Sequence, residues 1–326
     1  MVWHRSKRRR KLVLALIGPW LGLSPELVEE ALELAAGEGY ASSKSEDGKR
    51  LLATPVGLLY TAQVAILDSL LRTVPISAAA HGGVPGRSTL THARVHLPGA
   101  RHLLTLDIHR AYPSIRRPVV AGALRRALGG MLREEGLEAR LRRDVCDALA
   151  RITTTADGLP TGAPTSTTLF NLAAAPFDEA AEKLAAERLG ARGRYSRYLD
   201  DMAFSSAGPL PTELPELVAR ALKVHDLGAL NVAKTRRQDA TTGPMEITGI
   251  RAEGLGYGLD PGRLAKLAAA LEECLEAARS GDGRAARARA SGIRRYLQSI
   301  YGAARVPAQH ASLVRRVEAA AAEGTS

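Results

Sequence analysis

The tetrapeptide Tyr198-Leu199-Asp200-Asp201 lies within residues 194–206, where two short apolar stretches predict a β-hairpin. Adjacent strand residues point to opposite faces, so regular alternation would direct only one of the two aspartates inward. A tight turn would bring both to one site. Neighbouring carboxylates repel one another unless a cation neutralises them, and Mg²⁺ is a common partner. A solvated Asp-Asp turn explains this segment alone equally well.

A third carboxylate strengthens the metal interpretation. Asp107 ends the apolar strand predicted for residues 103–107. Three carboxylates from two strands suit two Mg²⁺ ions about 3.5–4 Å apart, the arrangement that supports in-line phosphoryl transfer. One ion would lower the pKa of a primer hydroxyl and the other would stabilise departing pyrophosphate. Asp107, Asp200 and Asp201 are therefore the candidate catalytic and metal-binding residues.

The composition indicates a folded protein with a polyanionic partner. Among 326 residues, 45% are hydrophobic, and the formal net charge is +11. Nucleic acid is the first candidate for so basic a protein, and a basic surface without a partner is the alternative. The two cysteines, Cys146 and Cys274, provide neither a disulfide framework nor a zinc site. They fit a reducing compartment, and we expect a cytoplasmic protein.

The N-terminal residues resemble a signal peptide without completing one. A basic run, residues 4–11, precedes an apolar run, residues 12–23. Ser24-Pro25-Glu26 then predicts a helix start, with serine as the N-cap and proline at the first helical position. We therefore expect a basic arm leading into core helices, and no membrane partner.

The remaining pattern mixes helices with short strands. Strands are predicted at 50–55, at 103–107, twice within 194–206, and around Asn231 and Ile247. Helices are predicted twice within 12–40, at 58–74, 117–153, 166–189 and 211–223, and through most of the chain after Pro261.

Four segments resemble, in order and spacing, the motifs of bacterial reverse transcriptases. These are Asp107–Ile115, Leu159–Ser166 with Asn171-Leu172, Tyr198–Asp201, and Lys234-Thr235-Arg236. The resemblance covers about residues 45–255. Two further segments resemble the retron type: residues 86–96 are similar to its Asn-Ala-x-x-His element, with His92 where asparagine is usual, and Ile247-Thr248-Gly249 to its Val-Thr-Gly element.

The resemblance implies an α+β fold shaped as a right hand, with fingers, a palm bearing a small antiparallel sheet, and a helical thumb. We expect a basic arm and helices over residues 1–40, fingers over 41–102, a palm over 103–254 and a thumb over 255–326. A fingers insertion is expected at about 116–157.

The resemblance also implies roles for single residues. Lys234 would act as general acid toward pyrophosphate, and Ile108 would offer a backbone carbonyl to a metal ion. Tyr112 would form the wall that excludes a 2′-hydroxyl, although a palm core tyrosine is the plainer alternative. Arg50, Thr161 and Gly162 would contact the nucleotide, although a solvated arginine beside Lys49 explains Arg50 alone equally well.

The family pattern is broken at three positions. Thr161 stands where glutamine is usual, Thr167 where proline is usual, and Ala111 where phenylalanine is common. Because the three carboxylates are intact, we retain the enzyme interpretation.

Basic residues suggest where nucleic acid would bind. Four arginines of the C-terminal region recur near one helical face, where they would contact duplex phosphates, although a solvated face is the alternative. They are Arg284, Arg287, Arg294 and Arg295. Arg87, His92 and His96 would contact RNA, and a structural role is the alternative for the two histidines.

The predicted function is RNA-directed DNA synthesis by a retron-type enzyme with two Mg²⁺ ions, acting in anti-phage defence. Its expected partners are a structured noncoding RNA that serves as template and primer, an RNA–DNA duplex and deoxynucleotides, with an effector protein as a further candidate. Three alternatives stay open. They are another bacterial defence reverse transcriptase with untemplated or protein-primed synthesis, an RNA-directed RNA polymerase, and an RNA-binding protein that has lost catalysis.

Overall fold

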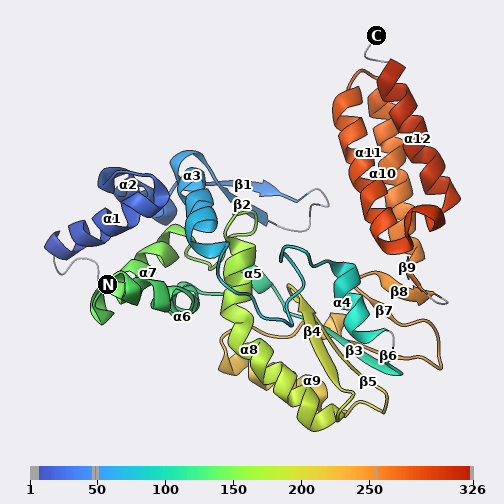
Figure 1. Ribbon diagram of the computed structural model, residues 1–326, viewed down its shortest axis with the longest axis horizontal. Helices are drawn as coiled ribbons and strands as arrows, with labels where there is room; N and C mark the ends of the chain where they lie inside the picture. Colours follow the sequence, from blue (N-terminus) through green and yellow to red (C-terminus); the bar gives the residue numbers. More distant parts are fainter. Residues whose placement is uncertain (1–6, 46–47, 49–50, 98, 254–255, 324–326) are drawn as a thin grey trace.

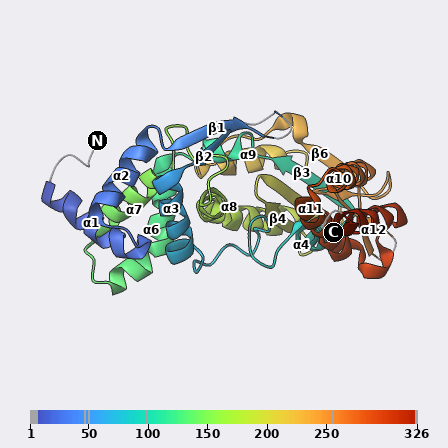
Figure 2. The same cartoon turned by 90° about the horizontal axis from the view of Figure 1, so that it is seen from above.

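The computed structural model describes residues 7–45, 48, 51–97, 99–253 and 256–323. Two perpendicular views show N-terminal helices at one end of the molecule and a bundle of C-terminal helices at the other (Figures 1 and 2). The four-stranded central sheet lies between them. Helices and small antiparallel sheets confirm the predicted α+β class.

The N-terminal end combines helices with a two-stranded sheet. Ser24 caps its second helix as predicted, because its hydroxyl accepts a hydrogen bond from the Leu27 amide at 3.4 Å. The elements are α1 (Lys7–Leu21), α2 (Pro25–Ala36), β1 (Tyr40–Lys44), β2 (Leu51–Pro55), α3 (Gly57–Ile66) with a π-helical turn (Leu67–Leu71), α6 (Arg117–Glu134) and α7 (Ala139–Ile152).

The central sheet has the strand order β4-β5-β3-β6, and every neighbouring pair is antiparallel. Its strands are β3 (His102–Asp107), β4 (Arg194–Tyr198), β5 (Asp201–Ser206) and β6 (Arg236–Asp239). Because strand residues alternate in direction, Leu104 and Phe204 join the large core on the face covered by α8 (Ser166–Leu189). Leu103 and Ala203 face the opposite way, toward α4 (Thr89–His96).

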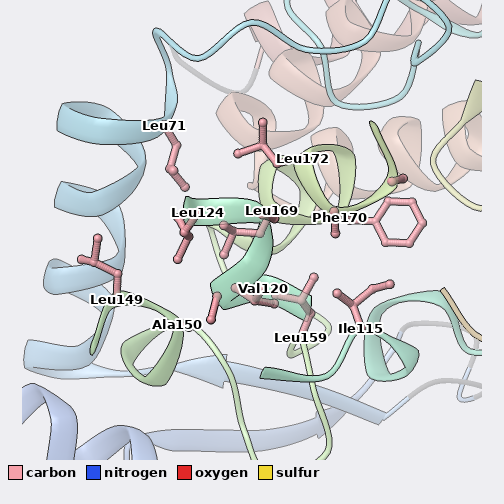
Figure 3. Close-up of a cluster of buried hydrophobic side chains, with 14 of the residues drawn as sticks. Leu71, Ile115, Val120, Leu124, Leu149, Ala150, Leu159, Leu169, Phe170 and Leu172 are labelled. Carbon is pink, nitrogen blue, oxygen red and sulfur yellow. The ribbon is translucent and has the colours of Figure 1, made fainter. Parts of the chain in front are cut away.

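The large core joins the central sheet to the N-terminal helices. Figure 3 shows side chains from α6, α7 and α8 meeting there, among them Leu124, Leu149 and Leu169, all fully buried. The short helix α5 (Ala111–Ser114) follows β3, and Ile115 behind it enters the same core. Burial of β3 before Asp107 and of Ile115 after it thus fixes the position of this segment. Helix α9 (Leu214–Val224) packs against α8.

The C-terminal part contains a second small sheet and three helices. Its strands are β7 (Glu246–Ile247), β8 (Ile250–Glu253) and β9 (Gly256–Leu259). Its helices are α10 (Pro261–Arg279), α11 (Gly283–Tyr301) and α12 (Ala308–Glu323), with a 3₁₀ turn at Ala303–Arg305. Leu297 and Ile300 of α11 share a core cluster with Leu90 of α4 and Leu103 of β3, which anchors the bundle to the central sheet.

The strand predicted around Asn231 is reduced to a single antiparallel β-bridge, in which Leu230 pairs with Ile108. The Asn231 amide donates to the Asp107 carbonyl at 2.7 Å, and the chain then forms a 3₁₀ turn at Val232–Lys234. Strand β6 begins only at Arg236, which pairs with Thr105. This turn brings Lys234 to the end of β3, where its ammonium meets the Asp107 carboxylate.

Within the described ranges, no single helix is long and apolar enough to cross a membrane. Helices α1 and α2 reach the required length and apolar composition only when taken together, and this pair is bent by 96°.

Candidate active site

The β3–β5 register places two of the candidate carboxylates directly opposite each other. Asp107 pairs with Asp201, and Asp200 occupies the turn that precedes β5. The Ile108 amide donates to the Asp200 carbonyl at 3.1 Å, so the turn is tied to the end of β3. Asp107 is 4% exposed, whereas Asp201 is exposed. The structure thus brings the three predicted carboxylates to one edge of the sheet.

The turn between β4 and β5 is tight, which is the condition under which both aspartates can reach one site. Leu199 adopts a left-handed backbone conformation with φ of 54°. That conformation is uncommon for a residue with a bulky side chain, and it is retained only where surrounding contacts enforce it.

A buried ion pair supplies those contacts. The Arg197 guanidinium binds both carboxylate oxygens of Asp178 at 2.9 Å, and both side chains are fully buried. It also donates to the Leu199 carbonyl and to Asn171 Oδ1, each at 3.0 Å. Burial alone would lower the pKa of Arg197, but the charge and hydrogen bonds of Asp178 more than offset this and raise it. The buried Arg197–Asp178 pair therefore stabilises the turn at Leu199.

The loop beside this turn approaches it closely. Asn171 Nδ2 donates to the Gly82 carbonyl at 2.9 Å. A Cβ atom added to Gly82 would lie 2.6 Å from Leu199 Cγ, so only glycine fits there without displacement. Sequence reasoning identified Asn171 through its motif but missed Arg197 and Asp178. A single charged residue in a short strand gives no signal of a partner 19 residues away.

Lys234 completes the charge arrangement. Its Nζ lies 2.9 Å from Asp107 Oδ2. The hydrogen bond to Asp107 is the largest cause that raises the pKa of Lys234, and the charges of Asp107, Asp200 and Asp201 add to it. A protonated lysine therefore faces all three carboxylates.

The three carboxylates are suitable ligands for magnesium, but their side chains do not converge on one position that an ion could occupy. Carboxylate oxygens are the ligands that Mg²⁺ prefers. Among the described residues, no group of three or more His, Cys, Asp or Glu side chains is arranged to hold a metal ion. Lys234 instead neutralises Asp107. Coordination through Asp107 Oδ2 would require Lys234 to release that oxygen.

The predicted nucleotide-binding residues lie on two neighbouring segments. The Tyr112 hydroxyl is 2.9 Å from Thr167 Oγ1, and its ring meets Phe170 edge-on with centroids 5.7 Å apart. The Thr161 carbonyl accepts from the Ala53 amide of β2 at 2.8 Å. A Cβ on Gly162, where φ is 110°, would lie 2.9 Å from a β2 hydroxyl. Arg50 lies outside the described residues.

Thr167 is a departure from the family pattern that the structure explains. Its hydroxyl fixes the orientation of Tyr112 through the hydrogen bond described above, which a proline at this position would not provide.

Two of the predicted RNA contacts are engaged within the protein. His96 is 2% exposed, and its two ring nitrogens lie 2.7 Å from Ser205 Oγ and 2.8 Å from Ser196 Oγ. Arg87 Nη1 donates to the backbone carbonyls of Ser77, Ala78 and Ala80. The structural alternative therefore describes His96 better than RNA contact, and Arg87 closes the loop that precedes α4.

The predicted phosphate-binding arginines lie on α11, away from its buried residues Ala286, Ala290 and Leu297. Arg284, Arg287 and Arg295 are exposed. Arg294 instead pairs with Glu318 of α12 at 2.9 Å. That ion pair joins two helices of the bundle and leaves three exposed arginines as the candidate surface.

A cavity of about 560 Å³ lies against the carboxylates. Asp107, Asp201 and Lys234 line one side. His92 lines it from α4, and Thr248 from the turn between β7 and β8. Its size is that of a small-ligand site.

Two curated relatives are retron reverse transcriptases from Myxococcus xanthus. The Mx162 enzyme is 31% identical over 231 residues, which cover 65% of this chain and 46% of that protein. The Mx65 enzyme is 30% identical over 295 residues, which cover 85% of this chain and 63% of that protein. The chain thus spans less than two thirds of the length of either relative. It matches no protein-family model.

Two solved telomerase structures are similar in fold to parts of the chain. The apo enzyme from Candida tropicalis, truncated from its C-terminal domain, has a TM-score of 0.44 at 11% identity, covering 70% of this chain and 55% of its own. The Candida albicans enzyme, in complex with the TWJ fragment of telomeric RNA, has a TM-score of 0.48 at 12% identity, covering 85% and 54%. By sequence, this chain is similar to bacterial retron reverse transcriptases, and a small antiparallel sheet lies between its helical ends.

Proposed function

We propose that this protein is an RNA-directed DNA polymerase of the retron type. The observation that carries the proposal is the pairing of Asp107 with Asp201 across β3 and β5, with Asp200 on the adjoining turn. That arrangement belongs to a chain whose curated relatives are reverse transcriptases. In this assignment the central sheet is the palm, β1 and β2 belong to the fingers, and α10–α12 form the thumb.

Magnesium is the proposed cofactor. Asp107, Asp200 and Asp201, with the Ile108 carbonyl, would hold two ions, which lower the pKa of the primer hydroxyl and stabilise the departing pyrophosphate when bound. The chain's own contribution is to hold the carboxylates at one edge and to keep a proton on Lys234. That proton is available to the pyrophosphate oxygen as the bond to the nucleotide breaks.

Deoxynucleotides are the proposed substrates. The Tyr112 ring contacts Phe170 edge-on and its hydroxyl meets Thr167, so the ring would form a rigid wall in α5, which follows the strand that ends at Asp107. A 2′-hydroxyl on the incoming sugar would meet this wall. Thr161 and Gly162 lie against β2 and are the further residues proposed to contact the nucleotide.

A structured noncoding RNA is the proposed template and primer. The exposed arginines of α11 support binding of an RNA–DNA duplex through its phosphates, and they provide no base contacts. We extend the proposal to anti-phage defence, with an effector protein as a further partner, because retron enzymes are the curated relatives.

The decisive experiment measures deoxynucleotide incorporation by the purified protein with Mg²⁺ and sequences the RNA that copurifies with it. Wild type is compared with the Asp200→Asn/Asp201→Asn variant, which keeps the size of both side chains. Synthesis that the variant lacks, joined to one copurified RNA, is expected. Absence of incorporation by wild type on every template would overturn the enzyme proposal.

Defence is tested separately by plating phage on cells that carry the wild-type gene with its native flanking DNA. Protection lost in the Asp200→Asn/Asp201→Asn cells is expected. Equal plaque numbers with and without the wild-type gene, across a broad phage panel, would argue against a defence role.

A further inference from the structure

A buried side-chain amide on α3 joins three elements that are far apart in the sequence. Gln63 is fully buried. Its Nε2 donates to the Ile152 carbonyl at 2.8 Å and to the Tyr40 hydroxyl at 3.0 Å. Its Oε1 accepts a hydrogen bond from the Thr165 hydroxyl, which is also fully buried, at 3.1 Å. Gln63 thus connects the end of α7 and the start of β1 to the start of α8.

The partners determine the orientation of this amide. A backbone carbonyl can only accept a hydrogen bond, so the nitrogen of Gln63 must face Ile152 and its oxygen must face Thr165. Both N–H groups of the amide are then used. An apolar side chain at residue 63 would leave buried polar groups without partners, which destabilises a folded protein. The position therefore requires a side chain that both donates and accepts.

Thr165 makes an unusual contact for a residue at the start of a helix. Threonine is a common N-cap residue, whose hydroxyl accepts a hydrogen bond from a backbone amide of the first turn. Thr165 occupies the N-cap position of α8 but makes no such hydrogen bond. Its hydroxyl donates to Gln63 instead. A local cap is thus replaced by a long-range contact, which fixes the end of the loop that precedes α8.

The same loop carries the proposed nucleotide contacts. Within it, the Thr161 carbonyl accepts a hydrogen bond from the Ala53 amide of β2 at 2.8 Å. Strand β2 pairs with β1, and β1 begins at Tyr40, which Gln63 binds. The contacts therefore form a closed path, from the loop to β2, from β2 to β1, and from β1 through Gln63 back to the end of the loop. Gln63 is the one side chain that completes this path.

We propose that Gln63 is a positioning residue, which fixes the loop of Thr161 and Gly162 relative to the β1–β2 sheet and thereby sets the affinity for the incoming deoxynucleotide. Because Gln63 is fully buried, it acts through Thr165 and does not touch the substrate. This inference rests on the proposed function, of which the nucleotide contacts are a part. Those contacts would exist before and during the chemical step alike, so their misalignment should weaken binding more than it slows the chemistry.

Steady-state incorporation kinetics distinguish this role from a loss of folded protein. Gln63→Leu removes all three hydrogen bonds with little change in size. We expect KM for the deoxynucleotide to rise about tenfold, as the loss of one net hydrogen bond would give, and kcat to stay within about twofold. A merely destabilised protein would contain less active enzyme, which lowers kcat and leaves KM unchanged. Thr153→Val is the matched control and should keep the wild-type KM, because this buried hydroxyl donates only to carbonyls of α7.

Thr165→Val tests the same hydrogen bond from its other end. It keeps the shape of the side chain and removes the hydroxyl that Gln63 binds, so KM should rise here too. This variant decides the question alone if Gln63→Leu does not fold. The double variant should have a KM little above that of Gln63→Leu, because both changes act through one contact. A wild-type KM in either single variant, or effects that multiply in the double variant, would overturn the inference.

Hydrogen exchange tests the position of the loop without requiring catalysis. The Ala53 amide, which donates to the Thr161 carbonyl, should exchange about tenfold faster in Gln63→Leu and Thr165→Val, relative to the amides of β3 and β5. Faster exchange at Ala53, with no incorporation by wild type, would leave the positioning role of Gln63 standing and remove the polymerase proposal. Incorporation by wild type, with unchanged exchange and KM in both variants, would have the opposite meaning.

Discussion

At the scale of single residues, Lys234 is the cation that pairs with the Asp107 carboxylate. If Lys234 is the proton donor, Lys234→Gln should lower kcat for incorporation by about 10²-fold, within the range for general acids. The same change removes the ammonium from Asp107 Oδ2, so the Mg²⁺ concentration for half-maximal activity should fall. Steady-state kinetics over a Mg²⁺ titration measures both. Lys223→Gln on α9 is the matched control, and an unchanged kcat in Lys234→Gln would contradict the assigned role.

A buried histidine makes stability depend on pH. Burial is the largest cause that lowers the pKa of His96, to about 3, from an ordinary value of 6.5. Below pH 6.5 the unfolded chain therefore binds a proton that the native state does not, so stability falls as the pH falls toward 3, by about 1.4 kcal/mol per unit for this group. Urea unfolding at pH 7 and pH 5 should show a shallower loss in His96→Asn than in wild type. Equal losses in the two proteins would contradict this assignment.

At the scale of secondary-structure elements, local patterns predicted most of the framework. The helix over 166–189 and the strand that ends at Asp107 were confirmed, because apolar periodicity and a terminal carboxylate are local signals. Around Asn231 only one β-bridge forms, because the Asn231 amide bonds to the distant Asp107 carbonyl and the chain then turns. The Arg197–Asp178 pair also forms through tertiary packing, and no local sequence pattern predicts it.

The packing of the loop before α4 against α8 is a testable element-level feature. Gly83 and Gly86 have similar left-handed conformations, with φ of 67° and 75°. A Cβ on Gly83 would lie 2.0 Å from Thr167 Cγ2, whereas one on Gly86 would meet nothing within 4 Å. Gly86→Ala should therefore lower the free energy of unfolding by about 1 kcal/mol, and Gly83→Ala by about 1–3 kcal/mol more.

Thr167→Ser removes the obstructing methyl group and keeps the hydroxyl that binds Tyr112. In that background, chemical denaturation should show Gly83→Ala costing little more than Gly86→Ala. A difference that persists would mean that the methyl contact is not the cause.

At the scale of the whole molecule, the chain separates a compact N-terminal half from a helical bundle and joins them through the central sheet. The bundle has its own core around Leu271, Leu275 and Val317. It is anchored by the α11 residues that meet α4 and β3. In both views α11 is the bundle helix nearer to the rest of the molecule (Figures 1 and 2). Of its exposed arginines, Arg284 and Arg287 lie near the start of α11, and Arg295 lies nearer the end that meets α4 and β3.

This placement predicts a specific dependence of duplex binding on salt. Replacing Arg284, Arg287 and Arg295 with glutamine should weaken binding of an RNA–DNA duplex and reduce the slope of log K against log salt by about 2–3, because each phosphate contact releases roughly one counterion. The matched control replaces three other exposed arginines, Arg133, Arg140 and Arg220, none of them on α11.

Both triple variants lower the formal net charge from +11 by the same three units, so a general charge effect would act equally on the two. Anisotropy titrations over 50–300 mM salt (roughly the range over which such contacts are resolved) should therefore separate them. Equal slopes for the two variants would show that overall charge, and not the surface of α11, holds the duplex.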